Sequence, residues 1–314
     1  MRPSLPQLEQ LFLTDAGLET DLIFNRGVEL PCFASIVLLQ DESGRAQLRD
    51  YFRACVEVAV RHDAGIILES ASWRAGPDWA APLGLSHGEL DRLNRASVEL
   101  LHELRHEFAG ERSPIVVSGC LGPRGDGYEP GRLMSAAEAE RYHGHQARVL
   151  ASANPDMLAA LTINNLGEAI GVTRAAAQTG LPFALSFTVE TDGRLPTGQP
   201  LGEAIEAVDE ATGGYPAYFM INCAHPSHFA SQLSGGDWVA RVRGIRANAS
   251  RCSHAELDAM TALDAGDPLD LGRRYAELRT QLPQLTVLGG CCGTDHRHLE
   301  AIADACMVTP LPSA

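Results

Sequence analysis

Short apolar segments alternate with longer segments of helical periodicity along this chain. Eight apolar runs have the length and composition of β-strands: residues 11–17, 65–70, 114–120, 156–161, 182–187, 218–223, 241–248 and 285–292. Hydrophobic residues between them recur at helical spacing, most clearly over 45–62, 88–108, 135–152 and 271–282. This alternation predicts an α/β fold, a (β/α)8 TIM barrel. A doubly wound open sheet is the alternative, but no G-x-G-x-x-G sequence follows the first strand.

Two segments depart from the alternation. Residues 21–44 follow the first strand without a regular pattern, so we expect an inserted loop that covers or shapes one end of the barrel. Residues 188–200 are rich in turn-forming residues and follow the fifth strand, which is typical of a mobile active-site loop. No repeat or long linker interrupts the rest, so we expect a single domain over residues 1–314.

Composition and charge narrow the range of functions. The chain has 314 residues, is 45% hydrophobic and has a formal net charge of −15 at pH 7. This charge disfavours nucleic acid and anionic membranes as partners, and its main effect is solubility. The N-terminus lacks a secretory apolar segment, and no run approaches the roughly 18 apolar residues of a membrane span. We expect a cytoplasmic protein that acts on small molecules, and the sequence leaves a homo-oligomer open.

Three of the eight cysteines follow predicted strands. Cys223 ends the sixth apolar run, and the adjacent pair Cys291 and Cys292 ends the eighth, within GGCCGT (289–294). In (β/α)8 enzymes the functional groups lie at the carboxyl ends of the strands, so we expect the three thiols to converge. Neighbouring residues of a strand point to opposite sides, and the glycines around the pair are expected to allow the necessary turn.

Three converging thiolates predict a zinc site with an open fourth position. A zinc ion with three thiolates is electron-rich, yet a thiol that coordinates it loses its proton, so the site favours alkylation of a thiol over hydrolysis. A redox pair is a further interpretation, although C-x-x-C is the usual spacing for one. Inert burial is another, and we prefer it for the remaining five cysteines: Cys32, Cys55, Cys120, Cys252 and Cys306.

The motifs GGCCGT, INC (221–223) and TDAGLET (14–20) resemble those of the homocysteine S-methyltransferases. The similarity in pattern covers nearly the whole chain. It implies a (β/α)8 barrel and the transfer of a methyl group from an onium donor to a zinc-bound thiolate, with homocysteine as the main candidate acceptor. S-methylmethionine, S-adenosylmethionine and betaine are the candidate donors. The residues implied to hold zinc are Cys223, Cys291 and Cys292, and those implied to hold the amino-acid part of the acceptor are Asp15 and the backbone of Ala16 and Gly17.

One position departs from the family pattern. Family members usually carry a glutamate at the end of the fourth strand that helps to bind the substrate ammonium, and Leu161 has that place here. Either Glu19, Glu69 or Asn164 then binds the ammonium, or the acceptor is a different thiol. A noncatalytic zinc or thiol-sensing barrel is the alternative from a different class of function.

Other side chains near the same strand ends are weaker candidates. Asn222 is expected to contact the substrate or to orient the residues around the metal. Trp73 is a candidate to stack on the cationic donor. Arg74 is expected to point outward or to pair with Glu69, and His298 to have a solvated surface position at the start of a helix.

Overall fold

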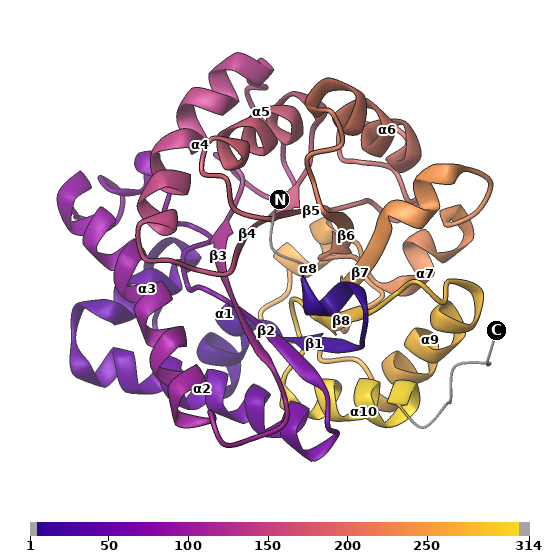
Figure 1. Ribbon diagram of the computed structural model, residues 1–314, viewed down its shortest axis with the longest axis horizontal. Coiled ribbons are helices and arrows are strands. Elements are labelled where there is room, and N and C mark those ends of the chain that lie inside the picture. Colours follow the sequence, from indigo (N-terminus) through magenta and orange to yellow (C-terminus); the bar gives the residue numbers. More distant parts are fainter. Residues whose placement is uncertain (1–4, 308–314) are drawn as a thin grey trace.

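Eight parallel strands close into a single barrel with a surrounding ring of helices (Figure 1). The computed structural model describes residues 5–307. Neighbours in sequence pair along the whole sheet, and β1 also pairs with β8. The strands are β1 (Phe12–Thr14), β2 (Gly65–Glu69), β3 (Ile115–Leu121), β4 (Met157–Ile163), β5 (Phe183–Phe187), β6 (Tyr218–Asn222), β7 (Val242–Ala247) and β8 (Val287–Gly290). The predicted single (β/α)8 domain is confirmed, and residues 1–4 and 308–314 lie outside the described part.

The helices follow the strands in sequence, and several begin at strong capping residues. Ser86 and Glu89 form a capping box at the start of α3, and Ser135 and Glu138 form one at α4. The predicted helical segments correspond to α2, α3, α4 and α9. The helices are α1 (Leu18–Thr20), α2 (Glu42–Arg61), α3 (His87–Glu107), α4 (Ala136–Ala151), α5 (Leu166–Ala177), α6 (Leu201–Thr212), α7 (Pro226–Phe229), α8 (His254–Asp258), α9 (Pro268–Gln281) and α10 (His296–Met307).

Apolar side chains fill both the space between barrel and helices and the interior of the barrel. Interior positions near the amino-terminal ends of the strands include Phe12, Met157 and Tyr218, all buried. The 3-10 helix η1 (Pro6–Leu8) covers this end, where the buried Gln7 donates from Nε2 to the Tyr218 hydroxyl at 3.4 Å. The chain near the N-terminus crosses this end of the barrel in Figure 1. The amino-terminal end of the interior is therefore closed.

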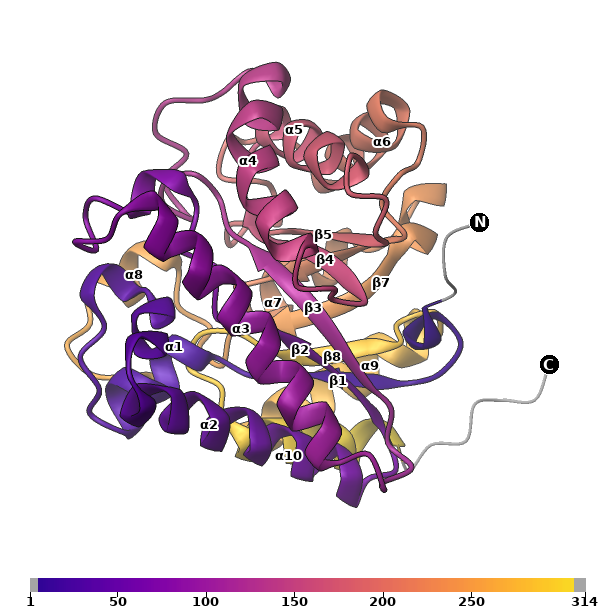
Figure 2. The same cartoon turned by 60° about the vertical axis from the view of Figure 1, so that its left-hand side comes forward.

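Toward the carboxyl ends of the strands, interior positions become polar. Side chains alternate along a strand, so Glu69 lies on the same side as Ile67, and Asn222 on the same side as Met220. Figure 2 shows α1 and α8, which follow β1 and β7, at the end of the molecule opposite the N-terminus. The polar end of the interior is where a site can form.

The two irregular segments have different outcomes. Residues 21–44 contain η2 (Asp21–Asn25), η3 (Pro31–Phe33), η4 (Ser35–Gln40) and the start of α2. Phe24 and Phe33 of this segment line the main pocket. The expectation that the segment shapes one end of the barrel is therefore confirmed. Residues 188–200 form a loop with Val189 and Leu195 buried. None of them lines the main pocket, so a direct role there is not seen.

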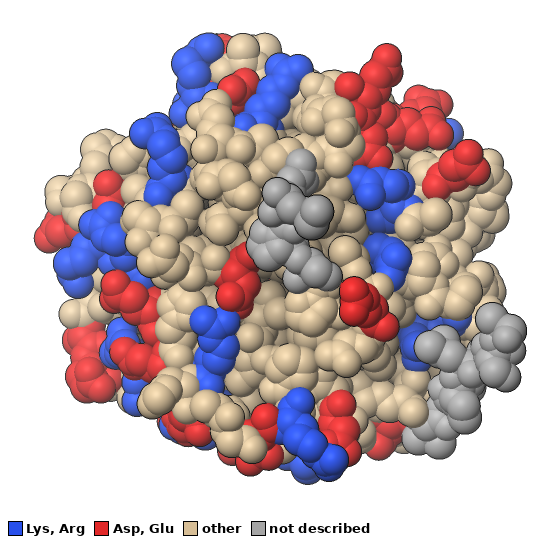
Figure 3. Space-filling view, in the orientation of Figure 1, with Lys and Arg blue, Asp and Glu red and all other residues tan. Residues whose placement is uncertain are grey.

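Figure 3 shows the face of the molecule at the closed end of the barrel. Basic and acidic side chains lie interspersed around the edge of this face (Figure 3). Among the described helices, none combines the length and the apolar composition needed to cross a membrane.

Candidate metal centre and active site

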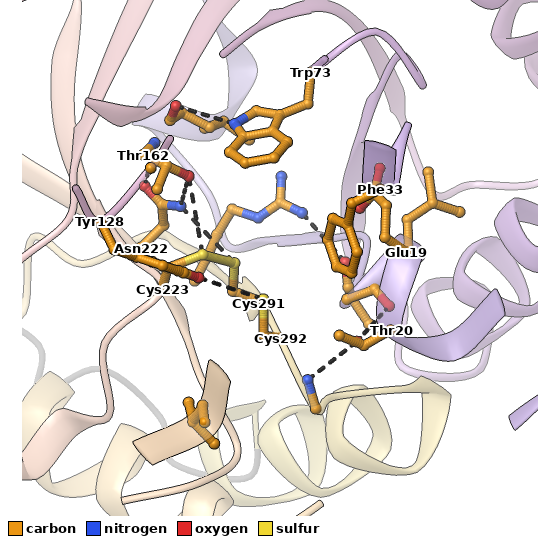
Figure 4. Close-up of a pocket in the computed structure, with 18 of the residues that line it drawn as sticks. Glu19, Thr20, Phe33, Trp73, Tyr128, Thr162, Asn222, Cys223, Cys291 and Cys292 are labelled. Carbon is orange, nitrogen blue, oxygen red and sulfur yellow. Dashed lines mark hydrogen bonds between the residues drawn. A yellow bond between two sulfur atoms is a disulfide. The ribbon is translucent and has the colours of Figure 1, made fainter. Parts of the chain in front are cut away.

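The three thiols predicted from the strand ends meet at the polar end of the barrel. The sulfur atoms of Cys223, Cys291 and Cys292 all lie within 4.8 Å of one another. Cys223 and Cys291 are joined in a disulfide, with Cα atoms 5.3 Å apart, and Cys292 is free beside them (Figure 4). The expected convergence is thus present.

The backbone that carries these thiols is held by neighbouring strands. Cys223 has a left-handed φ of 55°, which is uncommon for a residue other than glycine, and its N–H donates to the Arg246 carbonyl at 3.1 Å. Of the three glycines near the cysteine pair, only Gly293 has a positive φ, 80°. Gly289 and Gly290 lie within β8, where a β-carbon would overlap Thr14 and Thr294 respectively. The expectation that they allow a turn is wrong, because they allow close packing instead.

The first motif packs directly against the cysteine loop. A β-carbon on Gly17 would overlap the Cys291 carbonyl oxygen, so only glycine fits there without a shift. The Gly17 N–H donates to the Thr294 hydroxyl at 3.1 Å, and the Gly293 N–H donates to the Thr20 hydroxyl at 3.1 Å. These contacts join TDAGLET and GGCCGT, 277 residues apart in the case of Gly17 and Thr294. The role of Gly17 in substrate binding stays a prediction.

Asn222 ties three strand ends together. Its Oδ1 accepts from the Thr162 N–H at 2.8 Å and from the Ser186 hydroxyl at 2.6 Å. Its Nδ2 donates to the Thr162 hydroxyl at 2.8 Å and lies 3.8 Å from the Cys291 sulfur (Figure 4). Asn222 therefore orients the residues around the thiols, and its direct contact with substrate stays a prediction.

Tyr128 and His254 cover the other side of the thiols. The Tyr128 hydroxyl lies 3.7 Å from the Cys292 sulfur, and the tyrosine ring stacks on the His254 ring with centroids 3.8 Å apart. Nε2 of His254 is within 2.6 Å of the Cys223 carbonyl oxygen, to which Asn248 also donates at 3.1 Å. Burial raises the pKa of the Cys292 thiol to about 11. Tyr128 belongs to none of the motifs quoted above, and its place beside the thiols was not predicted from the sequence.

A buried ionic network forms the floor of the site. Arg246, at the centre of this network, was not predicted from the sequence. Nη2 of Arg246 donates to Asp15 Oδ2 at 2.9 Å, and Nη1 lies 4.0 Å from Glu69 Oε1. The Asp15 Oδ1 atom accepts from the Glu69 N–H at 3.1 Å. All three residues are at most 5% exposed. The one signal in the sequence was an arginine within the seventh apolar run.

Burial and the neighbouring charges have opposite effects on the pKa values of the three residues in this network. Burial raises the pKa of Asp15, although the Arg246 charge opposes the rise. Burial likewise raises the pKa of Glu69 to about 7, again against Arg246. Burial disfavours the Arg246 guanidinium, but Asp15 and Glu69 outweigh it and raise its pKa. Arg246 therefore remains charged, while Glu69 titrates near neutral pH.

Other expected contacts are corrected by the structure. Arg74 donates to Asp126 Oδ2 at 3.2 Å rather than pairing with Glu69. It lines the cavity, with its guanidinium 5.1 Å from the centroid of the Trp73 ring, so it does not simply point outward. His298 is fully buried, with Nε2 2.8 Å from the Ala265 carbonyl oxygen, so its expected surface position is wrong. Cys32 is exposed, so the expectation of burial is wrong for it as well.

The three cysteines, Asn222, Tyr128 and the charged network line one cavity of about 400 Å³. Trp73 and Phe33 form parts of its walls, and in Figure 4 Trp73 lies above the sulfur atoms while Phe33 lies to their right, beside Glu19. Nε1 of Trp73 donates to the Leu161 carbonyl at 3.3 Å, so the indole is held in place. The cavity thus combines aromatic walls, a cluster of thiols and a charged floor. Its lining also includes Ala16, Gly17, Asn222 and the buried network of Asp15, Glu69 and Arg246.

A family model matches almost the whole described barrel. Residues 12–306 match the model described as homocysteine S-methyltransferase. The chain belongs to the homocysteine S-methyltransferase family. Homocysteine S-methyltransferase 4 of Zea mays is 27% identical over 281 residues, which cover 82% of this chain and 77% of that protein. Homocysteine S-methyltransferase 1 of Brassica oleracea var. italica is 24% identical over 327 residues, which cover 93% and 92%.

Solved structures of one family member share the fold. The metallated form of the homocysteine methyltransferase MmuM from Escherichia coli has a TM-score of 0.70 at 20% identity, covering 94% of this chain and 96% of that one. Its oxidized form has a TM-score of 0.69 at 21% identity, covering 94% and 95%. At this identity the likeness shows the barrel fold. Membership of the family supports a thiol methyltransferase activity for the chain.

Proposed function

We propose that the protein is a zinc-dependent S-methyltransferase that moves a methyl group from an onium donor to a thiol, with homocysteine, which gives methionine, as the main candidate acceptor. The observation that carries the proposal is the cluster of three sulfur atoms within 4.8 Å of one another on the wall of the cavity. The aromatic walls and the family match support the same reading.

The residues present fit a zinc ion. Cys223, Cys291 and Cys292 would hold it once the disulfide is reduced. Among the described residues no carboxylate belongs to this group of ligand atoms, and three thiols suit zinc among the common metals. Bound zinc supplies a Lewis acid that favours the thiolate form of a coordinating acceptor. The proposal therefore includes a reducing, cytoplasmic setting, which is where thiols persist.

The chain's own residues bind and orient the two small-molecule substrates. In the reaction, the acceptor sulfur loses a proton to solvent and forms a bond to the methyl carbon. The bond from that carbon to the donor sulfur or nitrogen breaks, and its electron pair stays with the donor. Trp73 and Phe33 offer aromatic faces that attract a sulfonium or quaternary ammonium. S-methylmethionine, S-adenosylmethionine and betaine are the donors to be compared.

A noncatalytic thiol sensor is the second candidate, and the disulfide between Cys223 and Cys291 favours it. A sensor would cycle between this disulfide and the free thiols by exchange with small-molecule thiols and disulfides, which accept or supply the two electrons, without transferring a methyl group. Reduced, zinc-loaded protein that methylates no thiol with any of the three donors would support the sensor over the methyltransferase.

Metal analysis tests the proposal most directly. Reduced protein is expected to bind about one zinc per chain, and replacing Cys223, Cys291 or Cys292 by Ala is expected to remove both the metal and the activity. Cys306→Ala is the matched control, because this buried cysteine lies in α10 outside the cavity. Full zinc occupancy after Cys291→Ala would contradict the assignment.

A further inference from the structure

We propose that Glu69 and Arg246 bind the α-ammonium and the α-carboxylate of an amino-acid thiol. This inference rests on the proposed function, because it concerns the acceptor of the same cavity. It assigns the ammonium-binding role to β2 and the carboxylate-binding role to β7, at a site where Leu161 offers no charge.

The structure separates the three residues that are able to replace an acid at Leu161. The side-chain amide of Asn164 already has hydrogen-bond partners at both ends: Nδ2 donates to the carbonyls of Asp126 and Gly127, and Oδ1 accepts from Asn165. Glu19 accepts from the Ser35 hydroxyl at 2.8 Å and lies on the segment that follows β1. Glu69 differs from both, because its Oε2 atom is buried and has no hydrogen-bond partner among the described residues.

Arg246 provides a second buried polar atom without a hydrogen-bond partner within residues 5–307. Nη1 of Arg246 is also buried without a hydrogen-bond partner in the described part of the chain. Buried polar groups in proteins are nearly always hydrogen-bonded, so a pair of such atoms on a cavity floor indicates a missing ligand. Nη1 lies 4.0 Å from Oε1 of Glu69, so this unpartnered donor is next to the carboxylate group whose other oxygen, Oε2, is the unpartnered acceptor.

The chemistry of the pair selects an α-amino acid. The donor on Arg246 matches a carboxylate, and the acceptor on Glu69 matches an ammonium. An α-amino acid carries both groups on one carbon, so a single head group meets both atoms. Asp15, Glu69 and Arg246 together have one net negative charge when all are ionised, which favours a ligand that carries an ammonium.

The network also lies next to the thiols. The Arg246 carbonyl accepts from the Cys223 N–H at 3.1 Å, and the Arg246 Nε donates to the Gly290 carbonyl at 3.3 Å, one residue before Cys291. The network and the sulfur cluster also line the same cavity, so the proposal places the head group of an amino-acid thiol at Glu69 and its sulfur at the cluster. Asp15 acts as a positioning residue, because its carboxylate holds the Arg246 guanidinium at 2.9 Å.

The test compares three thiols for binding to reduced, zinc-loaded protein by calorimetry. Homocysteine has both groups, 4-mercaptobutanoate lacks the ammonium, and 3-aminopropane-1-thiol lacks the carboxylate. In the wild-type protein, loss of either group is expected to weaken binding about 10- to 100-fold, the usual range for a charged hydrogen bond. Glu69→Gln is expected to weaken homocysteine and the aminothiol by a similar factor and to leave 4-mercaptobutanoate unchanged.

The matched control is Glu168→Gln, another buried carboxylate, which lies outside the lining of the cavity and should leave all three affinities unchanged. A second variant adds an independent check, since Leu161→Glu in the Glu69→Gln background should restore homocysteine binding at least in part. Unchanged homocysteine affinity in Glu69→Gln would overturn the inference. If that variant does not fold, wild-type protein that binds homocysteine no more tightly than both truncated thiols would also overturn it.

Cobalt substitution separates this inference from the proposed function. A thiol that coordinates the metal changes the sulfur-to-cobalt absorption band. No change with any thiol would contradict the proposed function itself. An equal change and equal affinity for all three thiols, in wild-type and Glu69→Gln protein alike, would contradict only the roles of Glu69 and Arg246.

Discussion

Glu69→Gln is expected to change how the stability of the protein depends on pH. Burial raises the pKa of Glu69 from its ordinary value of 4.5 to about 7 in the folded state. Below about pH 4.5 the carboxyl group is protonated in both the folded and the unfolded chain, so it does not penalise folding. Between that pH and about 7 the unfolded chain ionises while the folded one holds its proton, so stability falls as pH rises.

The size of this effect follows from the two pKa values. One pKa unit corresponds to about 1.36 kcal/mol, so the change from 4.5 to about 7 amounts to about 3 kcal/mol. The free energy of unfolding of the wild-type protein, relative to Glu69→Gln, is therefore expected to fall by about 3 kcal/mol between pH 4 and pH 8. A glutamine does not titrate, so the variant lacks this loss.

Urea denaturation of both proteins across this pH range measures the difference. The pH dependence of metal binding is common to both proteins and cancels when the curves are subtracted. Glu168→Gln is a control of opposite sign: burial opposes ionisation of Glu168, but the hydrogen bond and charge of His143, together with hydrogen bonds from Arg124 and Asn165, outweigh burial and lower the pKa of Glu168. Relative to that variant, the wild-type protein gains stability as pH rises. Parallel curves for wild-type and Glu69→Gln protein would refute the reasoning.

Two further predictions concern the packing around the thiols. Gly17→Ala is expected to destabilise the fold by about 2 kcal/mol or more in chemical denaturation, because its β-carbon would overlap the Cys291 carbonyl, whereas Gly88→Ala, with nothing within 4 Å, should be neutral or slightly stabilising. Equal effects of the two would contradict the close contact. Tyr128→Phe removes the hydroxyl 3.7 Å from the Cys292 sulfur and is expected to weaken zinc affinity about tenfold in competition with a chromophoric chelator. Unchanged affinity would show that this hydroxyl does not support the metal site.

The parts of the structure that depend on local sequence were predictable. The strands and helices follow from apolar periodicity, which is set by neighbouring residues and needs no knowledge of the partners. The convergence of Cys223 with Cys291 and Cys292 was also predictable, since the strand ends of a closed parallel barrel share one rim whatever the details of packing.

The charged floor was not predictable, because its members pair across the barrel. Arg246 comes from β7 and contacts Asp15, directly after β1, and Glu69 of β2, and nothing in its sequence neighbours indicates that pairing. The surface position predicted for His298 was also wrong, because this residue follows a polar turn in the sequence but is buried against the chain at Ala265. Glycines 289 and 290 were misread for the same reason: the atoms they accommodate belong to distant or later residues, Thr14 and Thr294.

The closed amino-terminal end of the barrel has a kinetic consequence. Because η1 and Gln7 cover that end, we expect substrates to reach the cavity from the carboxyl ends of the strands. An acceptor held against Glu69 at the floor lies deeper than a donor held by Trp73 and Phe33 at the walls. If both substrates bind as proposed and pass through the same opening, we expect the acceptor to enter first and the demethylated donor to leave before the methylated thiol. The enzyme would therefore bind its two substrates in a fixed order, and excess donor would block the entry of the acceptor.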